Sequence, residues 1–568
     1  MNISLHIHGA AGTVTGSCHR LVTPDGELLV ECGMFQGPKS LRSLNYRRFP
    51  FEAAAIEAVL LTHAHIDHTG LFPKLALAGF RGKAWTTEAS RDLLHWLLPD
   101  AGAIQEGDVD RLNRRNSRRG EPRVAPIYTR IDAEASLSLL AVQHYDSWFE
   151  PMKGVRARLR NAGHILGSAF VEMEIDATPR PVRLVFSGDI GPQEKALQPD
   201  PSMPDPCDIL LLESTYGDRL RQRLTEAERR ALLGRELRDA LKAGGNVIVP
   251  VFAVERTQEI LDDIARLRRD REMRAVPVFL DSPLAGRTTE VFRRHHLALD
   301  RGTDGRVFTG GDFRLTETVE QSKAIGRIHG GAVILAGSGM CEAGRVKHHL
   351  KDHLWRPEST VLFVGYQAPG TLGALIRDGT PRVRIHGEEI NVKARIRAID
   401  AYSGHADRDE LVEWARPLLP ALGSALLVHG EPDALRGLAD GLSGAGLERA
   451  RIQAPDLDQA FDIVFRDDRW QTIRSPVAAA PRLASAQASA SRDWHNDYAA
   501  ALLDLRNALQ QEGDDRRRQQ LLSEVRRLID SHRIGGGDGS KPTGSSSTPR
   551  PTPRSNDAAA RRATLAGQ

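Results

Sequence analysis

The sequence lacks the features that mark secreted and membrane proteins. Its four cysteines, Cys18, Cys32, Cys207 and Cys341, have neither disulfide nor metal-site spacing, so we expect reduced, structural thiols. No apolar run reaches the roughly 18 residues that a membrane helix needs, which excludes a predicted span. The first residues lack a basic start followed by an apolar stretch. We therefore expect no signal peptide and a cytoplasmic protein with no membrane contact.

The chain also has little net charge. A formal charge of +3 over 568 residues neither requires nor excludes a nucleic-acid partner, so local patches must decide. Hydrophobic residues make up 40% and charged residues 27%, which is typical of a soluble globular protein. The length exceeds one ordinary hydrophobic core, and we expect at least two domains.

The texture of the sequence changes along the chain. Short strands with glycine-rich turns come first, and from about residue 218 helices and strands alternate as in a doubly wound α/β domain. Strand-like segments that end in histidines return after about residue 395, which predicts that the α/β region is an insertion into the first domain. The end of the chain is first charged and helical in character, then rich in Gly, Ser and Pro and predicted to be disordered. The predicted parts are residues 1–207, 208–385, 386–468 and 469–568.

A histidine-rich loop is the most informative stretch. Residues 59–61 form an apolar run typical of a buried strand, and His63-Ala-His65-Ile-Asp67-His68 follows. Residues two apart point the same way on an extended backbone, so His63 and His65 can bind one metal ion. A tight turn would let Asp67 and His68 face a second ion. A polar loop that happens to carry histidines is the alternative.

Other candidate ligands lie far away in the sequence. His164 lies in a turn of small residues, where a core histidine is the alternative to a third ligand of the first metal. Asp189 follows the apolar strand 182–186 between two glycines, where a carboxylate can bridge two cations. His405 and His429 also lie at strand ends, and both can reach the metal site if the first domain resumes there.

Strand ends of the α/β region carry candidate substrate-binding residues. Ser338 and Gly339 form a strand-to-helix turn and Arg345 follows in the helix, a combination that suits an anion. Arg256 and Ser282 also follow strands, on the side where such sheets bind ligands. Turn chemistry alone is the alternative for each of them.

Residues 88–119 are predicted to be helical and become basic toward their end. The arginines that cluster there are Arg111, Arg114, Arg115, Arg118 and Arg119. Such a run is most often a solvated helix face, and contact with phosphate is the alternative. The arginines of the C-terminal tail leave the same choice open between solvent and contact with RNA or another protein.

Taken together, these motifs resemble the metallo-β-lactamase superfamily. The similarity spans about residues 1–465. Three further motifs resemble those of the superfamily's β-CASP branch, which includes ribonuclease J and the nuclease subunit of pre-mRNA 3′-end cleavage. They are Glu213 in Glu-Ser-Thr-Tyr-Gly, His405 in Ser-Gly-His-Ala-Asp and His429 in Val-His-Gly-Glu. The resemblance implies an α/β fold, the αββα sandwich of the superfamily with an inserted α/β (β-CASP) cap domain.

The resemblance also implies a site with two Zn²⁺ per chain. The implied ligands are His63, His65 and His164 for one ion, Asp67, His68 and His429 for the other, and Asp189 between them. His405, paired with Glu213, would act as the general acid, and Ser338 and its neighbours resemble RNA phosphate contacts. A histidine at position 429 is the pattern of RNA-acting members. Glu31 stands where the family commonly has aspartate.

The implied function is that of a zinc-dependent ribonuclease, endo- or exonucleolytic, in RNA processing or decay. It would hydrolyse phosphodiester bonds of single-stranded RNA by metal-activated hydroxide, and a homodimer stays open. One alternative is a hydrolase of small esters or thioesters, which would not need so large a cap. The other is a non-catalytic RNA-binding subunit, and the presence of all the expected ligands argues against it.

Overall fold

The computed structural model describes residues 3–476 apart from 223, 300–307, 309–310, 312 and 368–369, and also 482, 505, 508–509 and 512–534. The chain forms two compact units, Met1–Asp497 and Tyr498–Gln568. In the second unit the structure describes helix α16 (Asp515–Ile534). The predicted disordered end, residues 535–568, lies outside the described residues. No described helix combines the length and apolarity needed to cross a membrane.

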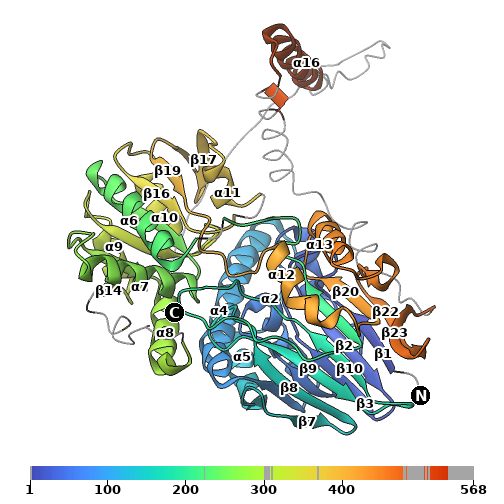
Figure 1. The fold of residues 1–568 in the computed structure, drawn as a ribbon. Helices are drawn as coiled ribbons and strands as arrows, with labels where there is room; N and C mark the ends of the chain where they lie inside the picture. The colour runs from blue at the N-terminus through green and yellow to red at the C-terminus, as the bar shows by residue number, and fades with distance from the viewer. Residues whose placement is uncertain are drawn as a thin grey trace, which may run out of the picture. The chain divides into compact units, whose positions relative to one another are not determined.

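Two sheets of the first unit face one another across a buried core (Figure 1). Within the described residues the first sheet contains, in spatial order, β23 (Arg469–Arg474), β22 (Gln459–Arg466), β1 (Ile3–Ile7), β2 (His19–Thr23), β3 (Gly26–Val30), β4 (Ile56–Leu60), β5 (Lys83–Thr86) and β6 (Leu140–Val142). The second contains β21 (Ile452–Gln453), β20 (Ser424–Val428), β11 (Ile209–Glu213), β10 (Val182–Phe186), β9 (Ala169–Ile175), β8 (Val155–Asn161) and β7 (Phe149–Met152).

Alternating side chains build this sandwich. Along β1, the residues of one face are buried and those of the other half-buried, as expected of a strand with one face on a core. The inward-facing residues of both sheets form one apolar cluster that includes Leu5, Leu21, Val171 and Leu184. The outer faces are covered by α3 (Phe72–Leu77), α4 (Glu88–Arg119) and α5 (Arg130–Ser136) on the first sheet and by α12 (Arg408–Ala415) and α13 (Pro432–Gly444) on the second. The predicted αββα sandwich is confirmed.

The inserted region forms a third sheet, which is parallel throughout. Its described strands, in spatial order, are β14 (Arg314–Leu315), β13 (Val278–Asp281), β15 (Val333–Gly337), β12 (Val247–Val251), β16 (Thr360–Phe363) and β19 (Arg395–Ala398). One face packs on α6 (Glu226–Lys242), α7 (Arg256–Arg269) and α8 (Pro283–Arg294), the other on α10 (Val346–His353) and α11 (Leu372–Arg377). Because both faces are covered, β12 is buried along its whole length. The other described elements are α1 (Lys39–Arg42), α2 (Ile66–Thr69), α9 (Val319–Ile325) and the hairpin β17 (Arg382–Ile385) and β18 (Glu388–Asn391).

The sheets do not follow the predicted division at residues 208 and 385. β11 lies between β10 and β20 in the sandwich, although its sequence follows the expected start of the insertion. β19 pairs with β16 in the third sheet, although it follows the expected end. Both strands are short apolar runs, and only pairing in space shows which sheet they join.

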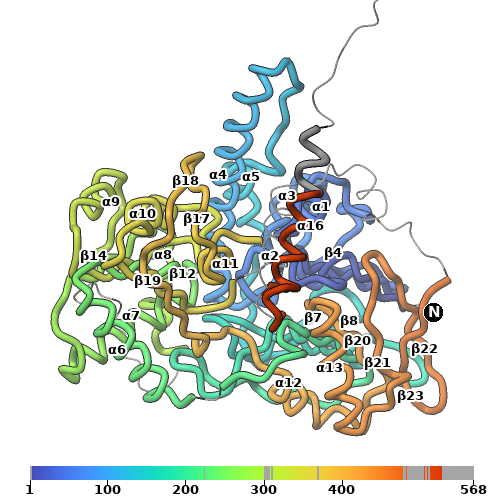
Figure 2. Tube along the Cα trace, turned by 90° about the horizontal axis from the view of Figure 1, so that it is seen from above, coloured from blue at the N-terminus to red at the C-terminus, as the bar shows by residue number. Residues whose placement is uncertain are grey.

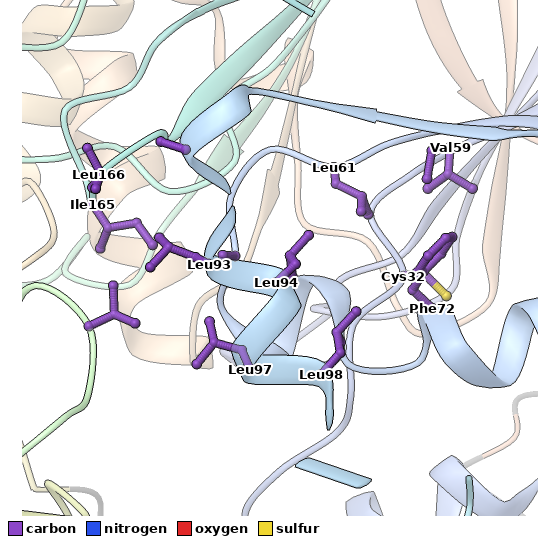
Figure 3. Close-up of a cluster of buried hydrophobic side chains, with 14 of the residues drawn as sticks. Cys32, Val59, Leu61, Phe72, Leu93, Leu94, Leu97, Leu98, Ile165 and Leu166 are labelled. Carbon is purple, nitrogen blue, oxygen red and sulfur yellow. The ribbon is translucent and has the colours of Figure 1, made fainter. Parts of the chain in front are cut away.

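Helix α4 packs against two of the segments that carry candidate ligands. Thr87 caps its start by accepting a hydrogen bond from the Ser90 amide, and Gly120 ends it in the left-handed conformation. Its buried face carries Leu93, Leu94, Leu97 and Leu98, which lie in one cluster with Leu61, Ile165 and Leu166 (Figure 3). Leu61 precedes the histidine loop and Ile165 follows His164, so α4 holds both segments against the same core. The far half of the helix extends past this core together with the segment that leads to α5 (Figure 2).

Candidate metal centre

The predicted ligands reach one place from four separate segments of the sandwich. The segment after β4 supplies His63 and His65, and α2 supplies Asp67 and His68. The turn between β8 and β9 carries His164. Asp189 follows β10 and His429 follows β20, the two strands that flank β11 in the second sheet. His63, His68, His164, Asp189 and His429 are all buried.

The first group consists of three imidazoles and one carboxylate. His65 Nδ1 lies 3.0 Å from His63 Nε2 and 3.2 Å from His164 Nε2. Asp189 Oδ2 lies 3.5 Å from the same nitrogens of His63 and His164. Ligand atoms about 2.0–2.1 Å from a tetrahedral zinc ion are separated by about 3.3 Å. The four atoms therefore have the spacing of a shared cation.

The second group lies directly beside the first. Asp67 Oδ2 is 3.9 Å from His68 Nε2 and 3.7 Å from His429 Nε2. Asp189 connects the groups, because its Oδ2 lies 3.2 Å from His68 Nε2 and its Oδ1 lies 3.4 Å from His429 Nδ1. Oδ2 therefore lies beside nitrogens of both groups, and Oδ1 lies beside His429 of the second.

Three atoms at the centre of this cluster have no hydrogen-bond partner among the described residues. They are His68 Nε2, Asp189 Oδ1 and His429 Nε2. A buried polar atom without a partner costs about 1–3 kcal/mol, and more when it is charged. Three such atoms in one buried cluster are expected where a cation belongs. The residues therefore fit the metal site that the sequence predicts.

Electrostatics favour a cation in the same place. Burial lowers the pKa of His63 and His164 well below the ordinary value, which favours the neutral imidazole that binds a metal. Burial also lowers the pKa of His68, but the nearby carboxylates of Asp189 and Glu31 outweigh it and raise that pKa well above its usual value. The surroundings of His68 therefore attract positive charge, whether a proton or a metal ion.

Glu31 orients His68. His68 Nδ1 donates to Glu31 Oε1 over 2.7 Å, which leaves His68 Nε2 facing the centre. Ser17 and Thr62 also donate their hydroxyl hydrogens to this carboxylate. Glu31 has a φ of 67°, and this unusual backbone accompanies the longer side chain at a position where the family commonly has aspartate. His164 is fixed similarly, since its Nδ1 donates to the Gly404 carbonyl oxygen over 2.7 Å.

A histidine–carboxylate pair adjoins the centre. His405 Nδ1 lies 3.2 Å from Glu213 Oε1, and the Glu213 side chain is fully buried. Glu213 also accepts hydrogen bonds from the backbone amides of Ile190 and Thr215. Burial lowers the pKa of His405, but the carboxylates of Glu213 and Asp189 outweigh it and raise that pKa above the ordinary value. The centre of the His405 ring lies 4.6 Å from that of His164, so this pair lies next to the candidate metal ligands.

Three family models match consecutive parts of the chain. The metallo-β-lactamase superfamily model matches residues 11–135, the Beta-Casp domain model 257–376, and the Zn-dependent metallo-hydrolase RNA specificity domain model 389–454. Ribonuclease TTHA0252 of Thermus thermophilus is 38% identical over 446 residues, which cover 78% of this chain and 96% of the relative. The chain belongs to the β-CASP branch of the metallo-β-lactamase superfamily.

Other β-CASP relatives are longer. Transcription termination factor FttA of Cenarchaeum symbiosum is 31% identical over 447 residues, and that of Methanocaldococcus jannaschii 29% over 448. These matches cover 76% of this chain and 66% and 67% of the two relatives, so the chain spans about two thirds of FttA. The matched domains and the converging ligands identify a metal-dependent hydrolase of the nuclease class.

The cap residues predicted to bind substrate fall into two sets: some lie at strand ends, and the arginines are bonded within the cap. Ser282, Ser338 and Gly339 lie together at the ends of the neighbouring strands β13 and β15, and a Cβ at Gly337 would lie 3.0 Å from Ser282 Oγ. Arg345 instead points inward, where it donates to Asp281 over 2.7 Å and to the Glu317 carbonyl oxygen over 2.8 Å.

Arg256 is also engaged within the cap. Its guanidinium donates to the Val364 carbonyl oxygen, and its Nε lies 3.8 Å from Glu259. In this structure both predicted arginines therefore hold strand-end loops in place. Within the described residues, no hydrogen bond or ion pair links either arginine to the metal ligands.

The sequence gives no signal for a further group that supports the centre. The buried Lys195 Nζ donates to the His164 carbonyl oxygen and lies 3.2 Å from Glu255 Oε1. Glu255 directly precedes α7 of the cap and also accepts a hydrogen bond from the Leu166 amide over 3.1 Å. These residues belong to no motif, because a lysine and a glutamate sixty positions apart have no diagnostic spacing. They join the His164 turn to the β-CASP region.

Proposed function

We propose that the chain hydrolyses phosphodiester bonds of single-stranded RNA with two zinc ions. The observation that carries this proposal is the convergence of two ligand groups on Asp189, beside the Glu213–His405 pair. The RNA specificity domain model, which spans both His405 and His429, supports RNA as the substrate. The relative named as a ribonuclease supports it as well.

The proposed ligand sets follow the two groups. His63, His65 and His164 would hold one ion, Asp67, His68 and His429 the other, and Asp189 would contact both. Bound zinc ions would lower the pKa of water at the site and offset the negative charge of the phosphate that is being cleaved. Glu31, through His68, and the Gly404 carbonyl, through His164, would keep the ligand nitrogens aimed at the centre.

The proton for the leaving group would come from His405. Glu213 holds Nδ1 of the ring, which leaves Nε2 as the position from which a proton can be transferred to the departing 3′ oxygen. The raised pKa favours the protonated form of this imidazole, the form that can donate. The products would carry a 5′-phosphate and a 3′-hydroxyl. The strand ends with Ser282, Ser338 and Gly339 would bind backbone phosphates, and Arg256 and Arg345 would shape the loops that do so.

The test uses the purified full-length chain. It compares two substrate classes, end-labelled single-stranded RNA and a thioester. We expect RNA cleavage with about two zinc ions per chain, and loss of cleavage in Asp189→Ala and His63→Ala. Glu213→Gln should slow cleavage by about 10²–10⁴-fold, the range of a general-acid contribution, with zinc content unchanged. Thioester hydrolysis without RNA cleavage would contradict the proposal, as would full turnover by Asp189→Ala. Comparing 5′-triphosphate and 5′-monophosphate RNA would show whether cleavage starts inside the strand or at its end.

A further inference from the structure

The far half of α4 is hydrogen-bonded to the segment that follows it. Asn113 Nδ2 donates to the Val124 carbonyl oxygen and Asn113 Oδ1 accepts from the Val124 amide, each over 2.9 Å. Asn116 Nδ2 donates to the Pro122 carbonyl oxygen over 2.8 Å. These bonds fasten the segment after the helix along one of its sides. In Figure 2 this part of α4 projects from the rest of the first unit.

The opposite side of this part of α4 carries a stripe of arginines. The stripe consists of Arg111, Arg114, Arg115 and Arg118, which are all exposed. Their spacing of i, i+3, i+4 and i+7 places them on one face of the helix. Val109 and Asn116 are buried on the side that faces the returning segment. The stripe is therefore fixed in direction and points to solvent.

The stripe carries more positive charge than its neighbours offset. Arg111 pairs with Asp108, but among the described residues no carboxylate lies within ion-pair distance of Arg114, Arg115 or Arg118. Like charges three and four residues apart destabilise a helix by about 0.2–0.5 kcal/mol per pair. A polyanion that lies along the helix would offset this repulsion between the arginines.

We propose that this arginine stripe is a docking site for the phosphate backbone of the RNA, remote from the metal centre. The inference rests on the proposed ribonuclease function, because charge complementarity to RNA selects the occupant. Ser90 Oγ in the first turn of α4 donates to the Gly167 carbonyl oxygen over 2.8 Å, next to the turn that carries His164. The stripe begins 21 residues further on, which is about 32 Å along a helix axis.

This distance sets a length requirement. At about 3.4 Å per nucleotide of a stacked strand, 32 Å corresponds to roughly nine nucleotides. An RNA of six nucleotides cannot occupy the centre and the stripe together, whereas one of thirty nucleotides can. The stripe should therefore strengthen the binding of long RNA and leave the cleavage of short RNA unchanged.

The experiment compares the triple variant Arg114→Gln/Arg115→Gln/Arg118→Gln with the wild-type chain. Binding of a 30-nucleotide single-stranded RNA is followed by fluorescence anisotropy between 50 and 200 mM salt, in an Asp189→Asn background that prevents cleavage. Each lost phosphate contact should lower the slope of log K against log salt by about 0.7, so we expect a decrease of about 2 for three contacts. In the active background, KM for the 30-mer should rise about tenfold or more, and kcat/KM for a 6-mer should not change.

The matched control removes the same charge elsewhere. Arg416, Arg436 and Arg449 are exposed in the same unit, and their triple replacement by Gln should leave the salt slope within about 0.5 of its original value. An unchanged slope in the stripe variant would overturn the proposal, and so would an equal loss for the 6-mer and the 30-mer. A change of oligomeric mass in the stripe variant, with RNA binding intact, would overturn it in favour of a contact between copies of the chain. Cleavage of the 6-mer reports on the proposed function separately.

Discussion

Replacing Lys195 by methionine should loosen the connection between the His164 turn and the cap. Lys195 is buried and lies 3.2 Å from Glu255 and 4.0 Å from Glu259. Arg256 approaches Glu259 to 3.8 Å, so the buried group consists of two cations and two carboxylates. Removing one charge leaves the charges of the other three groups unbalanced, and Lys195, Glu255 and Glu259 are buried.

The expected loss of unfolding free energy follows from the number of charges left unbalanced. Breaking a buried ion pair by removing one partner costs about 3–5 kcal/mol, because an uncompensated charge stays buried. Lys195→Met leaves a net charge of −1 in the group, and Glu255→Gln leaves +1. The double variant restores neutrality, with Arg256 facing Glu259. We therefore expect each single variant to lose about 3–5 kcal/mol of unfolding free energy and the double variant to lose about 1–3 kcal/mol less than the sum.

The assay is urea unfolding of the full-length chain followed by tryptophan fluorescence, with zinc content as a second readout. Lys195 donates a hydrogen bond to the backbone of His164, so Lys195→Met should also lower the metal affinity of the centre. Lys195→Arg keeps the charge and serves as the conservative control. If the two single effects add to within about 0.5 kcal/mol, the residues are not coupled and the reasoning fails.

Two further predictions concern metal and pH. Removing metal with a chelator should lower the unfolding temperature, because the buried atoms His68 Nε2, Asp189 Oδ1 and His429 Nε2 then have no partner. Adding zinc should restore the unfolding temperature. An unchanged unfolding temperature after verified metal loss would contradict a metal site at these residues. Burial by itself would raise the pKa of Asp281, but hydrogen bonds, first that from His349, hold it well below the ordinary value. A depressed folded-state pKa gives stability that is full above the unfolded pKa near about 4 and is lost as the pH falls through the folded value. Acid unfolding of wild type and Asp281→Asn should therefore diverge above about pH 4 and converge below it, and a constant difference down to about pH 2 would refute this.

Local patterns predicted single elements well. The strand at 182–186 and the helix at 88–119 have the observed bounds of β10 and α4, because an apolar run between turns and a capped helix are decided by neighbouring residues. The histidine loop was informative for the same reason, since its chemistry lies within six positions. Sheet membership depends on partners far away, which is why β11 and β19 lie on the other side of the expected boundaries. The homodimer and the contacts of the tail remain predictions from the sequence.

The arginines show most clearly what a sequence pattern cannot decide. Arg345 follows a glycine-rich turn that suits an anion, and the structure provides that anion from within: the buried carboxylate of Asp281, 64 positions earlier, accepts its hydrogen bond. The arginines of α4 have no motif around them, yet three of them find no carboxylate among the described residues. A guanidinium that is already paired must give up that partner before it binds a phosphate, whereas an unpaired exposed one gives up only water and counterions. Affinity for RNA backbone is therefore expected where the fold leaves positive charge unbalanced, and this favours the α4 stripe over the arginines of the cap.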